Sequence, residues 1–155
     1  MPTISTNVPS FTAAHTTFLK IVAALWVIWG LVHAFAGVMT ILADPATGFG
    51  NIADAVDPAV LAMDYPGAVG AVLNQHGWNL LWGGLVTITG AVFIWRRNLT
   101  AVWVTAMVGG LLDVGYFLFL DLGGYVRFVP GTIMTLVSST AILLSGWVWL
   151  AHRRA

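Results

Sequence analysis

The sequence has no cysteine and no glutamate, and only 8% of its 155 residues are charged. Without cysteine the chain has no disulfide, no thiolate metal site and no cysteine-based redox chemistry. Soluble domains carry roughly 25% charged residues, so this chain lacks the groups that cover a water-facing surface. Its formal net charge is zero and it has no basic run, which argues against nucleic acid as a partner.

Long apolar runs make up most of the sequence, which is 59% hydrophobic with a mean hydropathy of +0.89. A helix needs about 20 apolar residues to cross ~30 Å of hydrocarbon. Backbone groups in lipid must bond within their own segment, so each run is expected to be helical. We therefore predict an all-α integral membrane four-helix bundle. Its helices are expected at about residues 18–42, 74–95, 99–120 and 130–150.

The segments outside these helices are short, with one exception. Residues 1–17 are polar, lack the features of a cleaved signal and are expected to form a flexible cytoplasmic tail before a single domain at residues 18–155. Residues 43–66 form a long acidic first loop without Lys or Arg. Within it, Asp44-Pro45 is interpreted as a helix breaker, and Asp57-Pro58 predicts a short interfacial helix ending near residue 63.

The basic residues fall unevenly on the two sides of the predicted bundle. Only Arg127 lies on the side of the acidic loop, and the other side holds Lys20, Arg96, Arg97, Arg153 and Arg154. By the positive-inside rule, both termini are cytoplasmic and the acidic loop faces out. We expect a multi-pass protein of the bacterial inner (plasma) membrane.

Tryptophan and small residues give further hints about packing. Most tryptophans lie near predicted interfaces, but Trp26 and Trp29 lie well inside the first helix, where an aromatic belt does not explain them. Small residues at four-residue spacing, such as Gly30/Ala34 and Gly83/Thr87, predict closely packed helices.

Polar side chains from all four helices are predicted at a similar depth. At 1.5 Å per residue, Asp113 lies ~21 Å and His33 ~22 Å from the inner ends of their helices. The same count gives ~24 Å for Asn79, ~26 Å for Tyr116 and ~28 Å for His76. Thr135 of the fourth helix comes out at ~22 Å. These groups, with Arg127 just above them, predict a polar pocket near the outer face.

Asp113 is the most informative of these residues. A charged Asp in a membrane helix costs about 2.5–3.5 kcal/mol, so Asp113 is expected either to be protonated or to have a partner on another helix. His33 is the natural partner, and a bond to one ring nitrogen leaves the other free. The alternative is that the pair only joins the first helix to the third. For Asn79, His76 and the hydroxyl groups of the fourth helix, a purely structural role is likewise an alternative. His15 and His152 fall outside the bilayer core.

The outline resembles the DoxX-like families of small four-helix bacterial membrane proteins, through chain length, Gly-rich helices and the Trp-Gly-Leu-Val-His segment at residues 29–33. That resemblance implies the bundle and carries over no catalytic residue. The outline is also similar to the four-helix sterol isomerase and sigma-2 receptor superfamily. That superfamily uses His with acidic residues that usually include Glu, which this chain lacks.

Several functions are consistent with such a pocket. The leading hypothesis is binding of a small hydrophobic or amphipathic molecule, such as a quinone or lipid, by an accessory redox component. The predicted ligand-binding residues are His33, His76, Asn79, Asp113, Tyr116 and Arg127.

A second hypothesis is a membrane enzyme with an Asp113–His33 acid/base pair. Further alternatives are a b-type haem protein with two axial histidines, a metal site at His33, His76 and Asp113, a proton-coupled transporter, and a structural subunit. A homo-oligomer or a larger membrane complex is compatible with each.

Overall fold

The computed structural model describes residues 11–153, and every regular element in that range is helical. Four helical segments are long and apolar enough to cross a membrane: Ala13–Leu42, Gly67–Trp95, Leu99–Asp121 and Phe128–Arg153. The predicted all-helical class with four candidate membrane spans is therefore confirmed. The elements are α1 (Ala13–Leu42), α2 (Pro45–Ile52), α3 (Pro58–Leu61), α4 (Gly67–Trp95), α5 (Leu99–Tyr116), η1 (Phe117–Asp121), η2 (Phe128–Thr132) and α6 (Ile133–Arg153).

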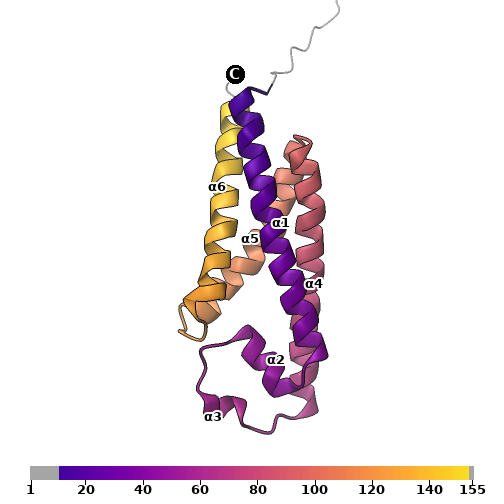
Figure 1. Cartoon of the computed structure of the whole chain (residues 1–155), viewed down its shortest axis with the longest axis vertical. Coiled ribbons are helices and arrows are strands. Elements are labelled where there is room, and N and C mark those ends of the chain that lie inside the picture. The colour runs from indigo at the N-terminus through magenta and orange to yellow at the C-terminus, as the bar shows by residue number, and fades with distance from the viewer. Residues whose placement is uncertain (1–10, 154–155) are drawn as a thin grey trace, which may run out of the picture.

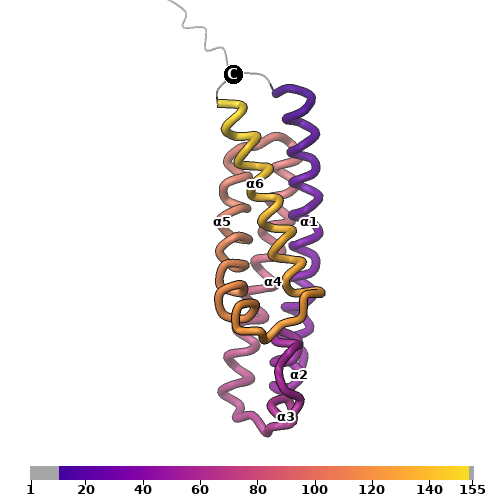
Figure 2. The backbone as a smooth tube through the Cα atoms, turned by 90° about the vertical axis from the view of Figure 1, so that its left-hand side faces the viewer, coloured from indigo at the N-terminus to yellow at the C-terminus, as the bar shows by residue number. Residues whose placement is uncertain are grey.

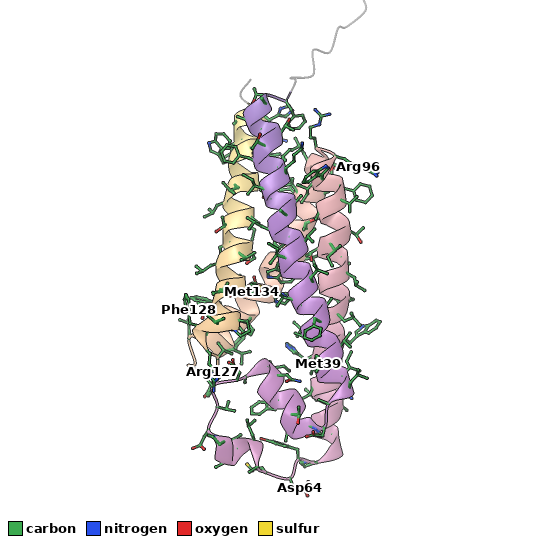
Figure 3. All side chains as sticks on the ribbon, viewed as in Figure 1. Met39, Asp64, Arg96, Arg127, Phe128 and Met134 are labelled. Carbon is green, nitrogen blue, oxygen red and sulfur yellow. The ribbon has the colours of Figure 1, made fainter. Side chains whose placement is uncertain are left out.

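The four long helices run side by side in one elongated bundle (Figures 1 and 2). The start of α1, the end of α6 and the α4–α5 turn lie together at what we call the termini end. The short helices α2 and α3 and the α5–α6 turn lie at the opposite, loop end. Arg96 and Arg127 mark these two ends in Figure 3. Arg154 lies outside the described residues.

Helix α1 packs against α4 and α6 and comes closest to α4. A Cβ atom at Gly37 would lie 2.5 Å from the Gly77 carbonyl oxygen, and one at Gly84 would collide with the carbonyl of Gly30. These backbones touch because no side chain separates them, as expected of small residues in membrane helices. Trp26 and Trp29 are both fully buried, which explains why they do not sit at an interface.

Helix α1 starts at Ala13, five residues before the predicted start. The Thr12 hydroxyl accepts a hydrogen bond from the His15 N–H at 3.1 Å and caps the helix. His15 of the extra turn packs against His152 of α6, and Phe11, just before the helix, stacks on His152 with ring centroids 4.2 Å apart. His15 and His152, which are predicted to lie outside the bilayer core, are only 7% and 8% exposed and so are buried within the protein. Residues 1–10 of the predicted tail lie outside the described part of the chain.

Helix α4 also starts earlier than predicted, at Gly67, and it runs without a break through Asn74, Gln75 and His76. These polar residues interrupt the apolar sequence but not the helix. Asn74 and Gln75 are exposed near the loop end, where the helix extends past α5 and α6. The hydropathy pattern therefore identified the start of the apolar stretch, whereas the helix itself starts two turns earlier.

The acidic first loop contains two helices, each started by an Asp-Pro pair. The predicted helix at Pro58 is confirmed, with Asp57 accepting from the Ala59 N–H at 2.8 Å. The interpretation of Asp44-Pro45 as the breaker after the first helix is confirmed, because α1 ends at Leu42; the same pair also starts an unpredicted helix, since Asp44 is the N-cap of α2. Its carboxylate accepts from the N–H groups of Ala46 and Thr47 at 3.0 Å and from the Thr47 hydroxyl at 2.7 Å. These hydrogen bonds, chiefly that from the Thr47 side chain, hold the pKa of Asp44 below its usual value.

Two hydrogen bonds tie this loop to the α5–α6 turn. The Ala55 N–H donates to the Tyr125 carbonyl at 3.0 Å, and the Arg127 N–H donates to the Asp54 carboxylate at 2.7 Å. The loop is thus attached on both sides of the bundle, through its own connections to α1 and α4 and through these contacts. It covers the loop end, below the ends of α5 and α6 in Figure 1.

Candidate functional site

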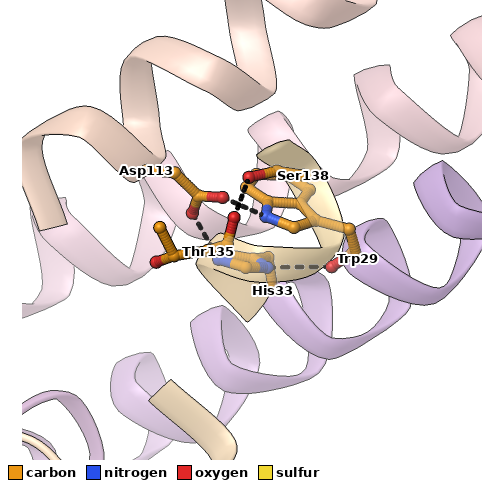
Figure 4. Close-up of polar contacts among 5 residues, drawn as sticks. All are labelled: Trp29, His33, Asp113, Thr135 and Ser138. Carbon is orange, nitrogen blue, oxygen red and sulfur yellow. Dashed lines mark hydrogen bonds and ion pairs between the residues drawn. The ribbon is translucent and has the colours of Figure 1, made fainter. Parts of the chain in front are cut away.

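A three-residue polar unit joins α1 to α5 inside the bundle (Figure 4). The Trp29 indole N–H donates to Asp113 Oδ2 at 2.8 Å, and His33 Nε2 lies 3.6 Å from Asp113 Oδ1. His33 Nδ1 is 2.8 Å from the backbone carbonyl oxygen of Trp29. The Trp29 and His33 rings are stacked, with centroids 3.6 Å apart. One turn of α1 therefore supplies two polar partners for one carboxyl group of α5.

Asp113 is 4% exposed, so its carboxyl group points into the bundle and away from the lipid-facing surface. The predicted pairing of Asp113 with His33 at matched depth is confirmed by this geometry. The expectation that the second ring nitrogen of His33 stays free was wrong. That nitrogen contacts the Trp29 carbonyl one turn earlier in α1, because a side chain can reach back to the carbonyl four residues before it.

The hydrogen bonds of His33 constrain where protons lie. A carbonyl oxygen only accepts, so Nδ1 must carry the hydrogen in its contact with Trp29. Nε2 and Asp113 Oδ1 then attract each other only when one more proton is present, either on the imidazole or on the carboxyl group. At 3.6 Å the contact is an ion-pair distance rather than a hydrogen bond. The contact is therefore attractive only while the pair holds one proton, on either residue.

A cavity of about 90 Å³ lies beside this unit toward the loop end. His33, His76, Asp113 and Tyr116 all line it, so four of the six predicted ligand-binding residues come together. All four membrane segments and α2 contribute to its wall. The remaining lining residues are apolar or small, apart from Asn51: Val32, Ala36, Asn51, Ile52, Leu80, Pro130, Gly131 and Met134.

A larger groove of about 500 Å³ continues from this cavity between α4 and α5. The two spaces share six lining residues, namely His33, Ile52, His76, Leu80, Asp113 and Tyr116. The outer rim of the groove consists of apolar side chains on the lipid-facing surface of the bundle. Val72, Leu111 and Phe119 there are 66%, 68% and 75% exposed. The polar cavity therefore opens sideways, through an apolar passage.

Two polar atoms near the cavity have no partner among the described residues. His76 Nε2 and Thr135 Oγ1 are both buried from solvent and make no hydrogen bond. His76 lines both the cavity and the groove, and Thr135 lies next to the Asp113–His33 pair in Figure 4. Buried polar groups are normally hydrogen-bonded, so the unpaired His76 Nε2 on the cavity wall is available to a bound molecule.

Asn79 and Arg127 do not line this cavity, so their predicted places in it were wrong. The Asn79 side chain accepts from the Trp82 indole N–H at 3.2 Å on the exposed side of α4. It lies three residues after His76, which turns it about 60° away around the helix axis. Arg127 is exposed, and only its backbone N–H contributes a contact, to Asp54. The position of Arg127 is set by the conformation of the α5–α6 turn, and counting the rise per residue along a helix does not predict the conformation of a turn.

Tyr116 closes one wall of the cavity against η2. Its hydroxyl group lies so close to Gly131 that a Cβ atom at that position would collide with it. A glycine is therefore needed opposite Tyr116 for the phenol to keep its place. The cis peptide bond between Val129 and Pro130 lies directly before this glycine.

Trp29 is the principal residue of this site that sequence analysis missed. A signal was present: Trp29 precedes His33 by four residues and so lies on the same face of α1. Ser138 of α6 was assigned to packing, yet its hydroxyl group, which donates to the Thr135 carbonyl at 3.1 Å, also faces the Asp113 carboxyl group. Asn51 and Ile52 were missed because α2 was not predicted.

The geometry fits neither of the metal hypotheses. Both nitrogens of His33 are engaged, one by the Trp29 carbonyl and one by Asp113, which leaves none directed at a haem iron. Within residues 11–153, no three His, Cys, Asp or Glu side chains group as metal ligands, so His33, His76 and Asp113 do not form the conceived metal set.

Comparisons of this chain with protein-family models, with curated proteins and with solved structures gave no match.

Proposed function

We propose that this protein binds a small amphipathic molecule, a quinone or a lipid, in the cavity beside His33 and Asp113. One observation carries this proposal: the buried His33–Asp113 pair and the unpaired His76 Nε2 line a cavity that opens sideways along an apolar groove. A molecule with a polar head and an apolar tail matches both parts. Ligand sites in proteins typically combine apolar walls with a few convergent polar groups.

A quinone fits this arrangement particularly well. Its ring oxygens accept hydrogen bonds when oxidised and donate them when reduced, and the His33–Asp113 pair can serve in both directions because it holds one transferable proton. His76 offers a second contact on the neighbouring helix. The isoprenoid tail of such a molecule would lie in the groove between α4 and α5. An accessory redox role in a membrane complex follows from this ligand class.

The proposed orientation places the termini end in the cytoplasm and the site near the outer face. Lys20, Arg96, Arg97 and Arg153 support it, because the positive-inside rule counts basic residues beside the spans. A bacterial inner membrane and a DoxX-like outline remain predictions of the sequence. Since the chain has no cysteine, single substitutions report sidedness. A membrane-impermeant maleimide should label Asp64→Cys in intact cells, and Arg97→Cys only after lysis.

Two variants test ligand binding. The protein is purified in mild detergent, co-purifying molecules are identified by mass spectrometry and absorbance, and a short-chain ubiquinone analogue is titrated back. We expect Asp113→Asn to abolish binding. His76→Leu should weaken binding at least tenfold while the fold persists, because the His76 ring makes no hydrogen bond that the bundle needs. Asp64→Asn is the control, an exposed carboxylate of the outer loop.

The result that overturns the proposal is specific. If both site variants keep the helical circular dichroism of the wild type and also keep its full complement of bound molecule, the cavity is not the binding site. If Asp113→Asn fails to fold, the His76→Leu result alone decides.

The shared proton favours a second candidate, acid–base catalysis by His33 and Asp113 on a membrane-dissolved substrate. A general acid or base must reach the proton it transfers, and both residues border the cavity. The co-purified molecule, returned to the protein in deuterated water, would then be converted or would exchange a carbon-bound hydrogen. His33→Gln would stop this reaction. An unchanged molecule in the wild-type protein leaves binding as the function.

A further inference from the structure

A second groove lies toward the termini end and has no lining residue in common with the His33 cavity. It has a volume of about 530 Å³ and runs between α1 and α4. Alanines at positions 23, 24 and 91 leave this space, because their short side chains do not fill the gap between the two helices. The rest of the lining is Val27, Ile28, Val92, Trp95 and Arg96.

Positive charge gathers at the open end of this groove. The Lys20 ammonium group lies 5.2 Å from the centroid of the Trp95 ring, and Arg96 is itself part of the lining. Every Asp of the sequence lies at positions 44–64, 113 or 121, away from the termini end. Within residues 11–153 neither cation is paired with a carboxylate, since the one ion pair there joins His33 and Asp113. An anion is therefore the missing partner.

We propose that this groove binds an anionic phospholipid. One acyl chain lies along Ala24, Val27 and Val92, and the phosphate group lies between Lys20 and Arg96. Basic sites between membrane helices recognise anionic head groups in this way. Trp95 is 53% exposed and places its ring at the level of the lipid carbonyls, the usual position of an interfacial tryptophan.

The groove distinguishes this site from the rest of the lipid-facing surface. Between apolar surfaces in a bilayer no hydrophobic driving force operates, so contact area and polar attraction decide which lipid stays. A convex helix surface contacts a chain on one side only, whereas the walls of the groove contact it from α1 and α4 together. The ligand class follows from these two features combined, an alkyl-sized channel and two unpaired cations at its mouth.

The test is native mass spectrometry of the full-length protein released from mixed micelles that contain phosphatidylglycerol and phosphatidylcholine with identical acyl chains. The wild type should retain phosphatidylglycerol in preference. Lys20→Gln and Arg96→Gln should each reduce that preference about fivefold, the effect expected of one cation near an anionic lipid surface. Arg153→Gln is the matched control. It removes one charge at the same end, from a guanidinium that lies 4.1 Å from the Trp149 ring on α6.

A second variant tests the apolar part without changing charge. Ala24 is exposed within the groove, so Ala24→Phe fills the channel and leaves the core intact. It should lower retention of the anionic lipid at least fivefold, with Lys20 and Arg96 still present. Equal retention of both lipids by the wild type overturns the proposal. So does an equal loss of preference in Arg153→Gln and Arg96→Gln.

This inference stands apart from the proposed ligand of the outer cavity. Asp113→Asn and His76→Leu should leave phosphatidylglycerol retention unchanged, and Ala24→Phe should leave quinone titration unchanged. Failure of one site therefore says nothing against the other.

Discussion

Trp29 and His33 stack ring on ring, with centroids 3.6 Å apart and planes inclined by 17°. They lie one turn apart on α1, and the stack fixes the imidazole so that Nε2 faces Asp113. The same indole donates its only N–H to the other oxygen of that carboxyl group. Trp29 thus positions both members of the proton-holding pair and touches neither the cavity nor the groove beyond it.

Replacing Trp29 with Phe should keep the stack and remove the donor. Asp113 Oδ2 would lose its 2.8 Å partner in a buried position. We expect the free energy of unfolding to fall by about 1 kcal/mol, the order found for hydrogen bonds between membrane helices. Quinone affinity should fall as well, because the carboxyl group becomes free to rotate. Denaturation in mixed micelles and quinone titration measure the two effects.

Trp78→Phe is the matched control for this change. Trp78 is 58% exposed on the outside of α4, so its replacement should alter neither quantity. Equal effects of the two substitutions would show that general loss of an indole, and not the bond to Asp113, is responsible.

The sequence was sufficient to predict the bundle and the Asp113–His33 contact. Both follow from quantities that the helix fixes: the length needed to cross hydrocarbon and the rise per residue, which sets depth. Depth counting brought two residues 80 positions apart to the same level. It succeeded because both lie in uninterrupted helices whose ends could be placed from basic residues and loops.

The errors arose where depth is not the deciding quantity. Asn79 has the correct depth and the wrong direction, because rotation about the helix axis decides whether a side chain faces the cavity. The position of Arg127 depends on a loop that is held by the hydrogen bond from the Arg127 N–H to the Asp54 carboxylate. Helix α2 was missed because Asp44-Pro45 both ends one helix and starts the next, as Asp57-Pro58 does for α3.

Replacing Gly131 with Ala should disturb the cavity without disturbing the bundle. The new methyl group would collide with the Tyr116 hydroxyl group and push the phenol toward the cavity. Quinone affinity should fall about tenfold, while helical circular dichroism stays at the wild-type value. Gly146→Ala is the control, since nothing lies within 4 Å of a Cβ atom at that position. A Gly131→Ala protein with wild-type affinity would show that Tyr116 does not border the bound molecule.

Asp54→Ala should loosen the cover of the loop end. The substitution removes the acceptor for the Arg127 N–H and leaves one of the two bonds between the acidic loop and the α5–α6 turn. Amide hydrogen exchange across α2 and α3 should rise several-fold, and bound ligand should dissociate faster, because Asn51 and Ile52 of α2 line the cavity. Asp64→Ala removes the same charge from an exposed position of the same loop. Identical exchange in the two variants would contradict a covering role for the Asp54 bond.

Gly84→Leu should separate α1 from α4 and destabilise the whole protein. Its side chain would enter the space occupied by the Gly30 carbonyl and by Ala34, where even a Cβ atom collides. Overpacking in a close-packed interior costs about 1–3 kcal/mol, and backbone offers less room to yield than side chains do. Gly146→Leu introduces the same side chain at an open position of α6 and should be tolerated. The two variants are compared by their denaturation midpoints in micelles. A loss of stability in Gly84→Leu alone would show that the α1–α4 contact stabilises the protein. Because that contact also fixes the height of His33 against α4, ligand binding should be lost together with stability in this variant alone.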